Sequence, residues 1–229
     1  MKIHGLQKMT LLDFPGLVAC TVFLGGCDMR CPFCHNSELL DMNAPAAMDE
    51  NNLLKFLEGR RGLLDGVAIT GGEPLLRRDI RELIISIREM GFKIKLDTNG
   101  NHPDRLISLV EEKLLDYVAV DIKNSKEKYG ETIGLPGFDI SRIEESVEFL
   151  LSKKVDFEFR TTVMKPYHDE TSFKGIAEWI KGADKYYLQE FVPRDTVPDQ
   201  NLVAYSKEEM RQFAQIVQPY VGLAEVRGV

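Results

Sequence analysis

The sequence predicts an α/β protein whose parallel sheet is built from six strand–helix units. Short apolar segments alternate with amphipathic ones, and strands are predicted to start near residues 18, 67, 93, 117, 156 and 185. The steps between these starts are 49, 26, 24, 39 and 29 residues, which leaves room for a helix after each strand. The strands are apolar along their length, as in parallel sheets covered on both faces. Periodicity leaves an open doubly wound sheet and a barrel as alternatives.

Each element has its own local signal. The strands are predicted at 17–24, 66–70, 93–97, 117–121, 156–163 and 185–191. Helices are predicted over 49–57, 79–90, 104–113 and 171–180, and from residues 141 and 206 onward. Asp49 is the expected N-cap of the first helix, and Ser141 with Glu144 and Ser206 with Glu209 have the spacing of capping boxes. Residues 37–47 are predicted to be irregular, 193–200 a mobile loop and 220–226 a short closing strand.

Composition limits the class of protein. A chain of 229 residues with 44% hydrophobic and 28% charged residues fits a single soluble domain. We expect that domain to span 1–229, with an N-terminal extension at 1–16, the core at 17–191 and a C-terminal segment at 192–229. A net charge of −7 argues against a nucleic-acid partner. The longest apolar run is too short to cross a bilayer, and residues 1–8 lack a signal-peptide core, so we expect a cytoplasmic protein without a membrane partner.

Three cysteines follow the first predicted strand. Cys27, Cys31 and Cys34 lie on one short loop after Gly25 and Gly26. Thiolates select zinc, copper(I) or iron–sulfur clusters. A closed zinc site needs a fourth ligand, and no second pair of cysteines follows; His35 adjoins Cys34 and is poorly placed to reach the same ion. Three ligands on a four-iron cluster leave one iron open.

The same loop also matches a haem-attachment pattern. The sequence from Cys31 to His35 matches the Cys-x-x-Cys-His pattern of c-type haem attachment. Such attachment belongs to exported proteins, and it would leave Cys27 without a role. The iron–sulfur cluster is therefore favoured over zinc and haem. Cys20, inside the first strand, is expected to be a small buried hydrophobic residue.

Further chemistry-bearing residues follow the next predicted strands. Gly71, Gly72, Glu73 and Pro74 come after the second strand, and two glycines allow a backbone to approach a ligand closely. The third strand ends at Asp97, Thr98, Asn99 and Gly100, and the fourth ends at Asp121 and Lys123. Sites in parallel α/β folds form at the carboxyl ends of strands. These segments are therefore expected to meet around the cysteine loop.

The cysteine motif, Cys27-x3-Cys31-x-Phe33-Cys34, resembles the cluster motif of the radical S-adenosylmethionine (SAM) superfamily. The following His35-Asn36 resembles that of its glycyl-radical-enzyme activases, and residues 13–36 are most similar to anaerobic ribonucleoside-triphosphate reductase activating proteins. The likeness extends to Glu190. It implies a partial (β/α)6 barrel open on one side, a [4Fe-4S] cluster held by the three cysteines with one open iron, and SAM as the second cofactor.

The resemblance also implies roles for residues. Residues 71–74 would hold the SAM amino group, with Glu73 acting on the ammonium directly or only fixing the loop. Asp97, Thr98 and Asn99 would lie near SAM, with a monovalent cation as a further candidate ligand. Asp121 and Lys123, the candidate catalytic pair, would lie beside SAM and the substrate peptide. The simpler alternatives are a turn at 97–99 and an ion pair between Asp121 and Lys123.

Other polar residues have weaker signals. Arg160 lies in an apolar strand, where its charge needs a partner, either the SAM carboxylate or a buried acid. Gln189, at the end of the sixth strand, is a candidate hydrogen-bond partner for the adenine or ribose. His168 is expected to be an exposed loop residue, and no role is assigned to His4 or His102.

The function implied by the resemblance is activation of a glycyl radical enzyme. Reductive cleavage of SAM would yield a 5′-deoxyadenosyl radical that abstracts hydrogen from a glycine of the partner, expected to be anaerobic ribonucleoside-triphosphate reductase. Alternatives are an activase of the pyruvate formate-lyase type and a small-molecule enzyme such as 7-carboxy-7-deazaguanine synthase. The sequence has no second cluster motif, so a flavodoxin or ferredoxin is the expected electron donor. Residues 193–203 are a candidate contact for the partner.

Overall fold

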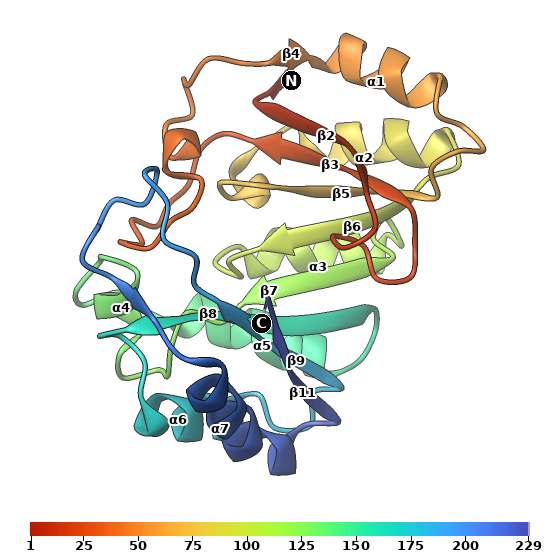
Figure 1. Ribbon diagram of the computed structural model, residues 1–229. Coiled ribbons are helices and arrows are strands. Elements are labelled where there is room, and N and C mark those ends of the chain that lie inside the picture. The colour runs from red at the N-terminus through yellow and green to blue at the C-terminus, as the bar shows by residue number, and fades with distance from the viewer. Residues whose placement is uncertain (229) are drawn as a thin grey trace.

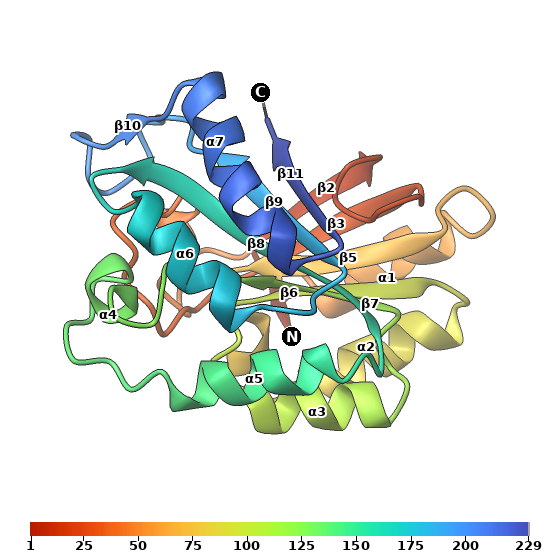
Figure 2. The same ribbon diagram turned by 90° about the horizontal axis from the view of Figure 1, so that it is seen from below.

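The computed structural model describes residues 1–228 as a curved, mostly parallel sheet with helices on its outer face (Figures 1 and 2). The strand order is β11-β9-β8-β7-β6-β5-β3-β2, and β10 pairs with β8 beside this path. The neighbours from β11 to β3 are parallel, whereas β2 is antiparallel to β3. The strands are β1 (Lys2–Ile3), β2 (Gly5–Thr10), β3 (Ala19–Leu24), β4 (Met48–Asp49), β5 (Gly66–Gly71), β6 (Lys93–Thr98), β7 (Tyr117–Asp121), β8 (Asp156–Lys165), β9 (Lys185–Glu190), β10 (Val203–Ala204) and β11 (Leu223–Arg227).

The sheet remains open on one side. β2 and β11 form its two ends, and they do not pair with each other within residues 1–228. This arrangement confirms the predicted α/β fold with a partial barrel. The strand predicted at 220–226 is β11, which pairs in parallel with β9 and lengthens the sheet instead of closing it.

The segment 1–16, predicted as an extension, belongs to the sheet in part. β2 pairs with β3 along the sheet edge, and β1 pairs with β4. Edge strands have one unpaired side and often carry polar residues, so β2, with the sequence GLQKMT, lacks the apolar signal of the inner strands. That is why the sequence pattern missed it.

Helices cover the outer face of the sheet (Figure 2). They are α1 (Glu50–Glu58), α2 (Ile80–Glu89), α3 (Pro103–Glu111), α4 (Tyr129–Thr132), α5 (Ser141–Leu151), α6 (Glu170–Trp179) and α7 (Lys207–Val217). Short 3₁₀ helices occur at Ser37–Leu39, Pro74–Leu76 and Gln218–Tyr220. None of the helices within residues 1–228 combines the length and apolar character needed to cross a membrane.

Two of the three predicted helix caps are confirmed. Asp49 accepts a hydrogen bond from the Asn52 amide, and Ser206 forms a reciprocal capping box with Glu209. The capping box predicted at Ser141 is wrong. The N-cap position of α5 is Ile140, whose side chain cannot accept a hydrogen bond, and the side chain of Asp139 accepts from the Ser141 amide at 3.0 Å instead.

The inner strands are buried along most of their length and place their carboxyl ends at one edge of the sheet, on the left in Figure 1. Val22, Ile69, Leu96 and Val118, one from each of four neighbouring strands, have no exposed surface. Burial on both faces explains the continuous apolar runs in the sequence. The loops after β3, β5, β6 and β7 leave from that one edge, so it is where a site can form.

Candidate functional site

A cavity of about 240 Å³ opens at the carboxyl edge of the sheet. Twelve of the fourteen residues singled out in the sequence line it: Cys27, Cys31, Cys34, Gly71, Gly72, Asp97, Thr98, Asn99, Asp121, Lys123, Arg160 and Gln189. The other two, Glu73 and Pro74, are buried and do not line it. Residues that the sequence reasoning did not select complete the lining: Met29, Phe33, His35, Asn36, Leu40, Thr70 and Thr162. Segments from six strands therefore share one chamber.

Three free thiols form one wall of this cavity. Burial raises the pKa of Cys27 to about 12 and that of Cys31 to about 11, and it also raises the pKa of Cys34. Such thiols ionise when a metal replaces the proton. Within residues 1–228 no three His, Cys, Asp or Glu side chains are grouped as ligands of one metal ion. The soft donors instead face a common chamber, and this donor set fits an iron–sulfur cluster.

The glycine pair lets the loop after β5 touch the cysteine loop. A Cβ atom on Gly71, whose φ is +125°, would lie 2.2 Å from the Leu24 carbonyl oxygen, and one on Gly72 would lie 2.1 Å from that of Gly26. The amide of Gly72 donates to the Leu24 carbonyl at 2.8 Å. Glycine is therefore required for this contact, and the bare backbone at 71 and 72 faces the cavity.

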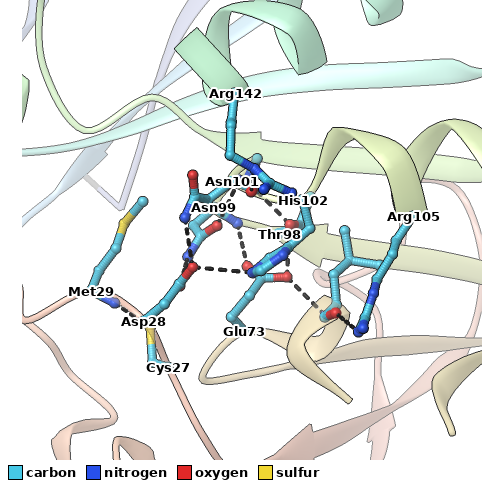
Figure 3. Close-up of polar contacts among 12 residues, drawn as sticks. Cys27, Asp28, Met29, Glu73, Thr98, Asn99, Asn101, His102, Arg105 and Arg142 are labelled. Carbon is cyan, nitrogen blue, oxygen red and sulfur yellow. Dashed lines mark hydrogen bonds and ion pairs between the residues drawn. The ribbon is translucent and has the colours of Figure 1, made fainter. Parts of the chain in front are cut away.

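Glu73 joins two of the loops. Its buried carboxylate accepts hydrogen bonds from the Leu75 amide at 2.9 Å, the Thr98 hydroxyl at 2.8 Å and the Asn99 amide at 2.7 Å (Figure 3). Burial raises the pKa of Glu73 to about 7. Since these contacts occupy both oxygens behind the cavity wall, they fit the loop-fixing role rather than direct contact with a ligand.

Five charged side chains form a connected set of ion pairs along one side of the cavity. Arg160 contacts Asp97 at 3.1 Å through Nη1 and Asp121 at 2.9 Å through Nε. Lys123 contacts the second oxygen of Asp121 at 3.1 Å, and Lys95 pairs with Asp97. Arg160 therefore pairs with two partly buried acids, so of the two kinds of partner predicted for it the structure shows the acid.

These contacts set the ionisation of the acids. Burial alone would raise the pKa of both carboxyl groups, but Arg160 with Lys123 lowers that of Asp121, and Arg160 with Lys95 lowers that of Asp97. Two carboxylates are thus matched by three cationic side chains. The array adds no electrostatic reason for a monovalent cation.

The segment 193–200, predicted as a mobile loop, is tied to the cysteine loop. His35 donates through Nε2 to the Val192 carbonyl at 2.8 Å and stacks on Phe191 with ring centroids 5.5 Å apart. Thr196 donates to the His35 carbonyl at 3.1 Å, and the Asp199 amide donates to that of Pro32 at 3.0 Å. The proline and charge content of the segment predicted a mobile loop. The sequence could not show that it is held in place, because its partners lie more than 150 residues away along the chain.

His168 is buried, so its predicted exposure is wrong. Only 1% of its surface is accessible, and its Nε2 donates to the Lys123 carbonyl at 2.9 Å. Burial lowers the pKa of His168 to about 4, which keeps the ring neutral at physiological pH. Its turn is polar in sequence, but it folds back beneath the loop that carries Lys123. Cys20 is fully buried, as predicted.

Sequence reasoning missed a second carboxylate junction. Asp28, beside Cys27, accepts hydrogen bonds from Asn99 Nδ2 and Asn101 Nδ2, both at 2.7 Å, and from His102 Nε2 at 3.1 Å (Figure 3). The available signal was a run of two amides and a histidine directly after a strand end. Nothing in the sequence alone paired that run with the cysteine loop 71 to 74 residues away.

Comparison of the sequence with known proteins identifies the family of the chain. The model of the radical SAM superfamily matches residues 21–180. A candidate glycyl-radical enzyme activating enzyme of Methanocaldococcus jannaschii is 32% identical over 99% of this chain and 96% of its own length. Pyruvate formate-lyase 1-activating enzyme of Escherichia coli K12 is 26% identical over 90% of this chain and 86% of its own.

A solved structure supports the fold. Streptococcus suis SuiB bound to S-adenosylmethionine aligns with a TM-score of 0.68 at 15% identity. The alignment covers 90% of this chain and 51% of SuiB, so this chain spans about half of that protein. At this identity the likeness concerns the fold alone.

Proposed function

The chain belongs to the radical SAM superfamily, and from this premise we propose that it is an activase that installs a glycyl radical on anaerobic ribonucleoside-triphosphate reductase. The observation that carries the proposal is the single chamber in which three free thiols face the glycine pair and the charged array. The names of two relatives that match almost the whole chain support the activase class.

The cofactors are a [4Fe-4S] cluster and SAM. When bound, the reduced cluster supplies the electron that cleaves SAM to methionine and a 5′-deoxyadenosyl radical. We assign Cys27, Cys31 and Cys34 as the cluster ligands. Their loop lies against the backbone of Gly71 and Gly72, which places uncovered carbonyl and amide groups next to the thiols.

The other cavity residues would orient SAM and keep water out. Gly71 and Gly72 are proposed to hold its amino group, with Glu73 and Pro74 shaping the loop from behind. Asp97, Thr98 and Asn99 face the chamber from β6 and the turn after it, and Gln189 faces it from β9, where a carboxamide can bond the adenine or ribose. We assign Arg160 to the same binding surface because it lines the cavity and carries a fixed positive charge.

Asp121 and Lys123 are proposed to act next to the substrate glycine. Lys123 approaches the Phe33 ring to 5.8 Å and pairs with Asp121, so its ammonium is held at the cavity wall. A charged pair held this way can dock the polar backbone of a peptide loop. Proximity then restricts the radical to the hydrogen that is presented to it.

Two features bear on the choice of partner enzyme. The sequence from Asp13 to Asn36 resembles reductase activating proteins, whereas the E. coli relative is named for pyruvate formate-lyase. Pyruvate formate-lyase is therefore the second candidate partner. We further propose a flavodoxin or ferredoxin as electron donor, and residues 193–203, tied to the cysteine loop, as part of the partner contact.

An anaerobic electron paramagnetic resonance experiment tests the proposal. The reconstituted, reduced protein is mixed with SAM and the same organism's anaerobic reductase, and in parallel with a pyruvate formate-lyase. The expected result is a glycyl-radical doublet on the reductase, absent when Cys31→Ala replaces the wild-type protein. A doublet only on the lyase would change the assigned partner. No doublet on either, while 5′-deoxyadenosine accumulates, would contradict the activase function and leave the SAM chemistry standing.

A further inference from the structure

Three side chains converge on the carboxylate of Asp28, which lies between two proposed cluster ligands, Cys27 and Cys31. All three donors come from one short segment after β6: Asn99, Asn101 and His102. The side chain of Asp28 is 21% exposed and that of His102 is 16% exposed, so solvent competes little for these bonds. Figure 3 shows the carboxylate enclosed by the three donors. Hydrogen bonds to a charged acceptor are among the stronger ones in proteins.

The orientation of two donors depends on this carboxylate. Asn101 donates to Asp28 through Nδ2, while its Oδ1 is buried and has no hydrogen-bond partner in the part of the chain that the structure describes. Asn99 donates its backbone amide to Glu73 and its side-chain amide to Asp28. One asparagine thus connects both carboxylates, and through them the loops after β3, β5 and β6.

The Asp28 contacts also hold the backbone next to Cys27, a proposed cluster ligand. The amide of Met29, directly after Asp28, donates to Cys27 Sγ at 3.5 Å. Hydrogen bonds to cluster sulfurs and the placement of nearby charge set the electronic properties of iron–sulfur clusters. A rotation of residue 28 would therefore change the environment of the Cys27 sulfur as well as the position of the loop.

We propose that Asp28 is a positioning residue for SAM cleavage: its carboxylate holds the cluster loop in register with the segment after β6 that faces SAM. The inference rests on the cofactor chemistry of the proposed function and is independent of the partner enzyme. Asp28→Asn keeps the size of the side chain, but its amide nitrogen cannot accept from a donor. At least one of the three donors is then left unpaired, and the loop loses its charged anchor.

The test uses SAM cleavage without any partner protein. Asp28→Asn is compared with wild type and with the control Asp41→Asn. Asp41 lies in the same segment between β3 and β4, does not line the SAM cavity, and accepts a hydrogen bond from the backbone amide of Asn43. Iron and sulfide content, the paramagnetic resonance spectrum of the reduced cluster with and without SAM, and the rate of 5′-deoxyadenosine formation with a chemical reductant are measured.

We expect Asp28→Asn to bind iron and sulfide as wild type does but to raise KM for SAM about 10- to 100-fold, as for a lost charged hydrogen bond. The SAM-induced change in the cluster spectrum should shrink, while Asp41→Asn behaves as wild type. Wild-type KM and spectrum in Asp28→Asn would overturn the proposal. If Asp28→Asn fails to assemble the cluster, Asn101→Ala, which leaves Asp28 in place, decides in the same assays: a raised KM with an altered spectrum supports the proposal, and wild-type values overturn it. Failure of the activase function would show only in partner assays, so the two failures are distinguishable.

Discussion

Replacing Gly72 by alanine should push the cysteine loop away from the rest of the cavity. A Cβ atom at this position would lie 2.1 Å from the Gly26 carbonyl oxygen and 3.2 Å from that of Leu39. Because real Cβ atoms essentially never approach other atoms closer than 3.0 Å, the two backbones must separate by about 1 Å. Backbone cannot rotate aside as a long side chain can, so the movement passes to the loop that carries Cys27.

The magnitude of the effect follows from that displacement. Forcing extra volume into a packed site costs about 1–3 kcal/mol of unfolding free energy. A misplacement of about 1 Å between reacting groups can lower a rate about 100-fold. We therefore expect Gly72→Ala to fold with reduced stability and to cleave SAM about 100 times more slowly than wild type.

Anaerobic guanidinium denaturation and single-turnover formation of 5′-deoxyadenosine measure the two effects. Gly59→Ala is the matched control, because Gly59 ends α1 with a φ of −72° and its added Cβ would have no neighbour closer than 3.6 Å. The control should retain wild-type cleavage. Wild-type stability and cleavage in Gly72→Ala would refute the reasoning, because it would mean that the contact between the two loops is not required.

Two further predictions concern charged groups inside the fold. Arg160→Met should lower the unfolding free energy by about 1–3 kcal/mol, because two partly buried carboxylates lose a shared partner while each keeps a lysine. Arg81→Met, at an exposed pair with Glu112, is the control in the same denaturation assay and should change little. Burial lowers the pKa of His168 to about 4 in the folded chain, below its unfolded value near 6.5. Between these pH values the unfolded chain binds one more proton than the folded chain. The free energy of unfolding should therefore fall by about 3 kcal/mol as the pH drops from 6.5 to 4. Thermal unfolding from pH 7.5 to pH 4.5 should show a shallower decline for His168→Asn than for wild type, and equal slopes would contradict the assignment.

Local signals in the sequence were enough for the parallel strands of the sheet, the order of the strands and helices between them and most of the predicted cavity residues. Apolar runs such as 66–70 and 117–121 predict buried strands because a parallel sheet covered on both faces leaves no polar side. The direction of parallel strands then brings their carboxyl ends together, so residues directly after them, among them Cys27, Gly71, Asp97 and Asp121, could be predicted to meet. These inferences need only the neighbours of each residue along the chain.

Contacts between distant segments were decided by the tertiary structure alone. Nothing in the sequence indicates that three of the hydrogen-bonded pairs should form: Asp28 with His102, Glu73 with Asn99, and His35 with Val192. Each pair forms because packing of the strands and helices brings two loops to the same edge, where a buried polar group must find a partner or cost free energy. The same requirement explains why His168 and the segment 193–200 are held in place although their composition is that of exposed loops. The sequence alone therefore determined most of the residues that reach the site, and the folded chain determined which contacts each of them makes.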